Sequence, residues 1–133
     1  MDWPLILRLG SLGVLMGLLT SLVGMPVSVE PWVWILIYAI WIAVLVHRRH
    51  PAPIRTATAA SLLAGALAGT AQTLLFGTYR ANNPWSADQI AGLDATSAAP
   101  GVIGTGLAAG LIFGLVTGAV ARVIIRRRFC SAL

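Results

Sequence analysis

The sequence predicts an all-α integral membrane protein that crosses a bilayer four times, with both termini on the cytoplasmic side. Hydrophobic residues make up 58% of the 133 residues and charged residues only 10%, whereas ordinary soluble chains carry about 25% charged residues. The charged residues divide the chain into four long uncharged runs, and most arginines fall on one side of the resulting topology. A soluble protein of this size would need a more polar surface than these residues supply.

Each uncharged run is long enough to cross the apolar core of a bilayer as a helix. The runs hold 21, 17, 24 and 27 residues, and a spanning helix needs about 17–25. An open strand would leave backbone groups unpaired in lipid, so even the second run, rich in β-branched and aromatic residues, is expected to be helical. The spans of this single domain are predicted near residues 5–25, 31–48, 56–78 and 100–125.

The arginines determine the predicted orientation. With the N-terminus inside, eight of the nine arginines face the cytoplasm and only Arg80 faces out. Cytoplasmic loops of membrane proteins carry such an excess of positive charge, so both termini are expected inside.

The segment 79–99 is predicted to be the one long outer loop. Within it, Ser86 and Gln89 have the spacing of a helix-capping box. We therefore expect a short interfacial helix near residues 86–93, with Trp85 and Ile90 dipping inward.

Small residues recur at every fourth position in three of the four predicted spans. Residues four apart share a helix face, and small ones allow two backbones to approach closely, which drives helix pairing in lipid. The first, third and fourth spans are therefore expected to form a tightly packed core. The glycines predicted at these contacts are Gly13, Gly17, Gly65, Gly69, Gly106, Gly110, Gly114 and Gly118.

The second span contains no glycine and carries an aromatic face instead. Trp34, Tyr38, Trp41 and Leu45 recur at helical spacing and so share one side of the helix. One interpretation is a lipid-facing helix with interfacial aromatics. The other is a docking face for another membrane protein, a lipid or a pigment.

No charged residue lies in the middle of a span, which disfavours proton-coupled transport through a buried carboxylate. The most polar residue in mid-span is Gln72, which could form a hydrogen bond with a neighbouring helix. Alternatively, Gln72, Thr73 and Thr105 could line a polar path through the protein.

The sequence predicts neither an enzyme nor a cofactor site. His47 and His50 could share a helix face, but two arginines lie between them and no third ligand completes a metal site. Cys130 has no catalytic motif around it, and no stripe of basic residues with interleaved aromatics points to nucleic acid.

The third span, followed by Tyr79, Asn83 and Pro84 and then by a glycine-rich last span, resembles a family of small four-helix bacterial membrane proteins. The resemblance covers about the last half of the chain. The family is a domain of unknown function, so the resemblance implies four spans and a bacterial inner membrane, and it implies no activity.

Two functional hypotheses follow. The first is a non-catalytic accessory or assembly subunit that docks on other integral membrane subunits through its aromatic second helix. The alternative is a small homo-oligomeric channel or transporter with a polar path near Gln72.

Overall fold

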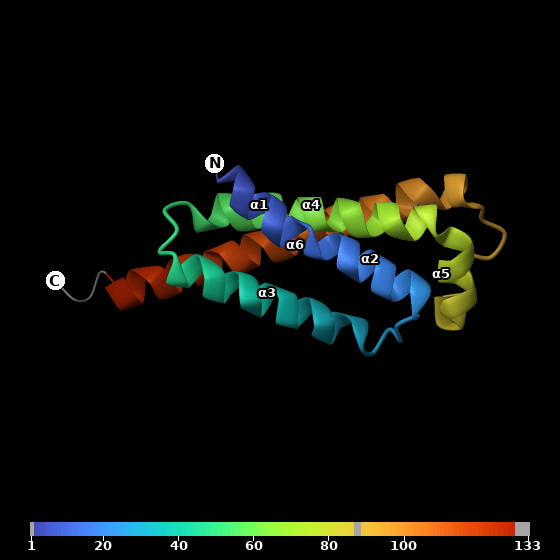
Figure 1. The fold of residues 1–133 in the computed structure, drawn as a ribbon, viewed down its shortest axis with the longest axis horizontal. Helices are drawn as coiled ribbons and strands as arrows, with labels where there is room; N and C mark the ends of the chain where they lie inside the picture. Colours follow the sequence, from blue (N-terminus) through green and yellow to red (C-terminus); the bar gives the residue numbers. More distant parts are fainter. Residues whose placement is uncertain (1, 87–88, 130–133) are drawn as a thin grey trace.

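A computed structural model describes residues 2–86 and 89–129 of the chain. Within these ranges the protein is helical, and its long helices run side by side, with α3 diverging from α4 and α6 toward its N-terminal end (Figure 1). The elements are α1 (Trp3–Gly10), α2 (Leu12–Leu22), α3 (Glu30–His47), α4 (Pro53–Leu74), α5 (Phe76–Asn82), the 3-10 turn η1 (Pro84–Ser86) and α6 (Ala95–Phe129).

Three helical stretches are long and apolar enough to cross a membrane, and a fourth qualifies if a bent pair counts as one span. The three are Trp3–Leu22, Glu30–His47 and Ala95–Arg128. The bent pair consists of α4 and α5, whose axes meet at 88°. The predicted all-helical class is thus confirmed for the described residues, with three or four candidate spans.

α4 is the central helix of the bundle. It contacts α1, α2 and α6, whereas α3 packs mainly against α6. The residues of α4 that face its neighbours are mostly alanine, serine and glycine, so neighbouring backbones can lie close to it. The first, third and fourth predicted spans therefore make up the tightly packed part of the protein.

The eight glycines predicted at helix contacts all lie where these backbones approach. A Cβ atom built on Gly110 would lie 2.6 Å from the carbonyl oxygen of Ser61, and one on Gly69 would lie 2.9 Å from Cα of Ile103. Gly65 and Gly106 face each other across the α4–α6 contact in the same way. By contrast, Gly104 of α6 faces open space.

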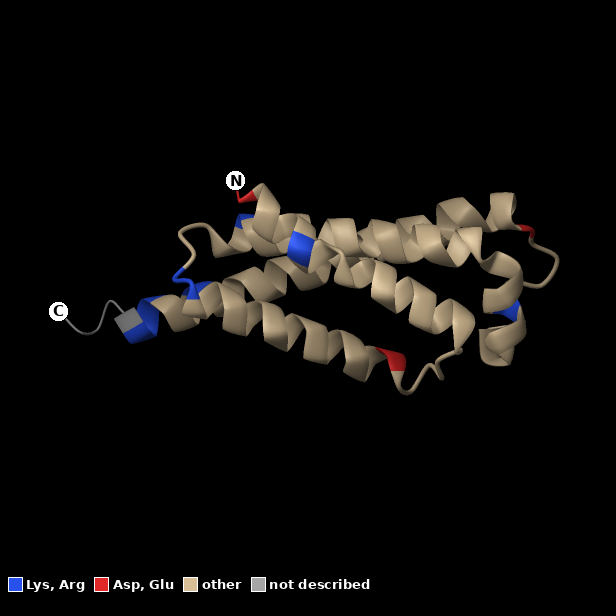
Figure 2. Ribbon diagram, viewed as in Figure 1, with Lys and Arg blue, Asp and Glu red and all other residues tan. Residues whose placement is uncertain are grey.

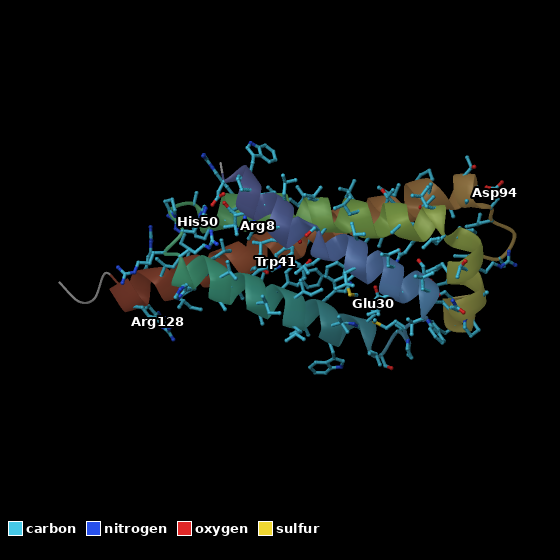
Figure 3. The ribbon with its side chains drawn as sticks, in the orientation of Figure 1. Arg8, Glu30, Trp41, His50, Asp94 and Arg128 are labelled. Carbon is cyan, nitrogen blue, oxygen red and sulfur yellow. The ribbon has the colours of Figure 1, made fainter. Side chains whose placement is uncertain are left out.

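Charge is distributed unequally between the two ends of the bundle. Most basic residues lie at the end of the bundle where α1 begins and α6 ends. The acidic residues at the start of α3 and just before α6 lie at the opposite end (Figure 2). Figure 3 places Arg8, His50 and Arg128 toward the first end, which we call the arginine end. Asp94 and Glu30 lie toward the opposite, acidic end.

The helices converge at the arginine end around a well-packed core. Ile6 of α1, Trp41 and Leu45 of α3, and Ala57 of α4 belong to one cluster there and are at most 1% exposed. Ala121 of α6 completes the cluster at 0% exposure. No comparable filling lies between α3 and the other helices near the acidic end, where a cavity opens.

The predicted interfacial helix near residues 86–93 is wrong for the described part of that segment. Residues 89–92 form a turn and a bend, residues 93–94 have no regular structure, and residues 87–88 lie outside the described range. The short helix lies earlier, as α5, because the chain bends sharply at Leu75 instead of continuing the third span. Ile90 is buried as expected, whereas Trp85 is 43% exposed and does not dip inward.

The capping box of this region also lies elsewhere, at the start of α6. The Ser97 amide donates to Asp94 Oδ1 at 2.8 Å, and the Asp94 amide donates to Ser97 Oγ at 3.1 Å. The Ser97 amide and the Ser97 hydroxyl both donate to the Asp94 carboxylate, which favours its ionised form and lowers the pKa of Asp94 below its usual value. α6 therefore begins five residues before its predicted start, at Ala95.

Two asparagines of α5 and the adjoining turn cap the end of α2. The buried Asn83 side chain donates to the carbonyl oxygens of Thr20 and Tyr79, at 2.8 and 2.7 Å, and accepts from the Met25 amide at 3.1 Å. Asn82 donates to two further carbonyls at the end of α2. Because the last carbonyls of a helix lack partners within the helix, these contacts join α2 to α5.

Candidate functional site

A cavity of about 940 Å³ lies between α3 and the helices α2, α4 and α6. We call it the α3 cleft. It extends from Glu30 and Gln89 at the acidic end to Ile42 and Val120, deep along α3 and α6. Its walls are mostly apolar, with a few polar side chains, and its volume falls in the range of about 300–1,000 Å³ that is usual for small-molecule sites.

The aromatic face of α3 points inward rather than away from the protein. Trp41 and Leu45 are both 0% exposed, and Figure 3 places Trp41 between the helices. Trp34 and Tyr38, which are partly buried, line the α3 cleft. The predicted docking face of Trp34, Tyr38, Trp41 and Leu45 is therefore wrong for Trp41 and Leu45, which the chain's own helices cover, while Trp34 and Tyr38 face the cleft.

Ring contacts and one hydrogen bond hold this aromatic face against the other helices. The Tyr38 ring stacks on Trp34 and on Phe113 of α6, with centroids 5.8 and 5.6 Å apart, and meets Trp41 edge-on at 5.2 Å. The hydroxyls of Tyr38 and Ser61 share a hydrogen bond of 2.9 Å across to α4. Phe113, which lines the cleft, lies outside the residues singled out from the sequence.

Gln72 links two helices and also lines the α3 cleft. Its Nε2 donates to the hydroxyl of Thr20 on α2 at 2.9 Å, so the predicted interhelical hydrogen bond is present. Thr105 lines the same cavity from α6. Thr73 does not line it, and its hydroxyl donates to the Gly69 carbonyl one turn back. Two of the three residues predicted for a polar path therefore meet in one cavity.

Glu30 is the charged residue among the described residues of the cleft wall, and it lies outside the candidate site residues predicted from the sequence. It is the first residue of α3, it lines the cavity and it is partly exposed. Within the described residues, no hydrogen bond or ion pair engages its carboxylate. The spacing of Glu30, Trp34 and Tyr38, each four residues from the next, already places the three on one helix face.

The cleft is closed toward the arginine end. Ile6, Trp41, Leu45 and Ala121 fill the space between the converging helices there. A solute that enters from the acidic end therefore meets packed apolar side chains before the arginine end. Among the described residues, the cavity therefore ends at these packed side chains and does not reach the arginine end.

The histidine pair lies outside the cleft, at the arginine end. His50 Nδ1 accepts a hydrogen bond from the Ala52 amide at 3.2 Å, and its Nε2 lies 3.7 Å from an Asp2 oxygen. His47 is exposed. Among residues 2–86 and 89–129, no group of three His, Cys, Asp or Glu residues could hold a metal ion. Cys130 lies beyond the described residues.

Comparisons of the chain with protein-family models, with characterised proteins and with solved structures found no match.

Proposed function

We propose that this chain is a small four-span transporter that takes up an amphipathic molecule in the α3 cleft. The observation that supports it most directly is the cavity itself: large, mostly apolar, and reached by the polar groups of Gln72, Tyr38 and Thr105. Such a wall suits a molecule with an apolar body and one polar group. The cavity lies within one chain, so binding requires no second copy.

The proposal includes a membrane location, the inner membrane of a bacterium, with both termini in the cytoplasm. The arginine end and the acidic end support this orientation, since positive residues accumulate on the cytoplasmic side. In this orientation the bent pair of α4 and α5 counts as the third span, in which α4 crosses the membrane and α5 turns along the outer surface. The α3 cleft then opens toward the outside.

The topology is tested by reporter fusions. We expect reporters fused after residues 50 and 133 to read as cytoplasmic, and a reporter at residue 90 to read as external. The physical reason is the cost of moving several arginines across the membrane against the positive-inside bias. A cytoplasmic signal at residue 90 would contradict the four-span orientation.

Because the cavity is closed at the arginine end, a transporter that exposes its site to one side at a time is favoured over an open channel. Passage past Trp41 and Leu45 requires the helices to move apart, because both side chains are fully buried. α3 is the helix best placed to move, since it packs mainly against α6 and carries no glycine contact to α4.

A bulky side chain in the cleft should reduce the binding of the amphipathic molecule. Ala39 of α3 lines the cavity, whereas Ala43, one turn further on, does not, and both are exposed. We expect wild-type protein purified in mild detergent to retain a small amphipathic molecule, detected by native mass spectrometry. Ala39→Trp should reduce its occupancy at least about tenfold, an effect of about 1.4 kcal/mol. The matched variant Ala43→Trp should leave occupancy unchanged.

The same purification tests the accessory-subunit hypothesis, which remains the second candidate. It now requires another face of α3, on which Trp32, Leu36 and Ile40 are 70%, 61% and 47% exposed and recur every fourth residue. Foreign membrane subunits that co-purify in fixed ratio, with an empty cleft, would favour docking over transport. Equal retention of the small molecule by Ala39→Trp and Ala43→Trp would also contradict binding in the cleft.

A further inference from the structure

Glu30 gives the α3 cleft a fixed negative charge. Among the described residues that line the cavity, it is the one that carries a charge. It is also the first residue of an 18-residue helix and lies at the acidic end of the bundle. Arg80, the basic residue of the acidic end, lies on α5 and does not line the cavity. The described part of the chain therefore leaves this charge uncompensated.

Aromatic rings continue from this carboxylate into the cavity. Trp34 and Tyr38 follow Glu30 on the same face of α3, and Phe113 stacks on Tyr38 from α6. All three rings line the cleft. Aromatic faces attract cations, and tryptophan does so most strongly. The other polar groups of the wall that reach the cavity, Gln72 and Thr105 among them, are uncharged.

We infer that the α3 cleft selects organic cations with an apolar body, such as quaternary ammonium or phosphonium compounds. This inference rests on the proposed uptake function and adds the class of substrate. The apolar body lies along the walls of α3 and α6, and the positive charge lies between Glu30 and Trp34. An anion of the same shape is rejected, because the described lining residues offer it a carboxylate and no positive partner.

A small inorganic cation fits this site poorly. Metal ions need several oxygen or nitrogen ligands, whereas the described residues of the cleft supply one carboxylate and a mostly apolar wall. A large organic cation is weakly hydrated and keeps favourable contacts with apolar and aromatic groups. The single carboxylate is then sufficient to set the preferred sign of charge.

The test compares two probes of nearly equal shape and opposite charge, tetraphenylphosphonium and tetraphenylborate. Binding to purified protein in a neutral detergent is measured by titration calorimetry, with protein-free micelles subtracted. We expect the wild type to bind the phosphonium at least about tenfold more tightly than the borate. Glu30→Gln should weaken phosphonium binding about tenfold and bring the two affinities together, since it removes the charge and keeps the shape.

Two further variants test a charge outside the cleft and an aromatic ring inside it. Asp94→Asn removes an exposed carboxylate at the same end that does not line the cavity, and it should leave phosphonium binding unchanged. Trp34→Leu should weaken phosphonium binding about threefold while borate binding stays within experimental error. Each variant is compared only where its thermal melting matches the wild type.

The outcomes distinguish this inference from the function on which it rests. If both probes bind wild type equally, or if Glu30→Gln leaves their affinity ratio unchanged, cation selection is overturned while uptake in the cleft stands. If neither probe binds and the protein carries no small molecule, the proposed uptake function fails and the inference fails with it.

Discussion

Gly110→Leu and Gly69→Leu are each expected to prevent the helices from assembling. A leucine at either position would push its Cβ into backbone atoms of the facing helix, at 2.6 Å from the Ser61 oxygen or 2.9 Å from Ile103 Cα. Backbone atoms cannot move aside as a flexible side chain can, so α4 and α6 would have to separate. Overpacking in a core costs about 1–3 kcal/mol even where side chains can adjust, and here we expect more.

Gly104→Leu is the matched control for this prediction. Gly104 lies on α6 between these contacts, and a Cβ there would have no neighbour within 4 Å. The same substitution should leave stability equal or slightly higher, because leucine favours helix by up to about 1 kcal/mol over glycine. Size-exclusion chromatography and thermal melting in detergent measure the difference. Normal behaviour of Gly110→Leu and Gly69→Leu would show that these faces do not pack closely.

Asn83→Leu is expected to lower the free energy of unfolding by about 2–4 kcal/mol. Asn83 is 2% exposed, and its side chain makes three hydrogen bonds, to Thr20, Tyr79 and Met25. Leucine would leave two carbonyls and one amide buried without these partners. Because these bonds fix the end of α2 against α5, the loss should loosen the wall of the α3 cleft as well.

Asn83→Asp separates the hydrogen bonds from the packing. The substitution keeps the shape of the side chain and the acceptor for the Met25 amide, but it replaces the donor to both carbonyls with an oxygen. We expect it to destabilise as strongly as leucine does, since a carboxylate would face two carbonyl oxygens. Urea or thermal unfolding of both variants in detergent measures this. A neutral effect of Asn83→Asp would mean that the donor bonds contribute little.

The helical class and the main contacts of the helices could be predicted from local information in the sequence. Run lengths between charges are set by the thickness of the apolar core that a helix must cross, so the second span was placed within a residue of α3 at each end. Glycine spacing identifies a face through helical geometry alone, and Gly65 and Gly106 indeed lie at the α4–α6 contact. These features depend on residues close to one another in the chain.

The direction of the aromatic face could not be decided in this way. The spacing of Trp34, Tyr38 and Trp41 shows that they share a side of α3, but it does not show whether that side faces lipid, a partner or the protein. The packing of α3 against α6 turns the face inward, and the contacts of Tyr38 with Phe113 and Ser61 join segments far apart in the chain.

Local sequence patterns did not predict the bend that ends α4 either. Residues 56–78 read as one apolar run, yet the chain turns at Leu75 because Asn82 and Asn83 pair with carbonyls at the end of α2, about 60 positions earlier. The sequence by itself determined that the chain is helical, where its long apolar stretches lie and on which faces the small residues lie, since these follow from hydrophobicity and helical periodicity. Only the tertiary structure decided that α3 stands apart from α2 and α4 at the acidic end, because the cleft between them depends on long-range contacts that no local pattern encodes.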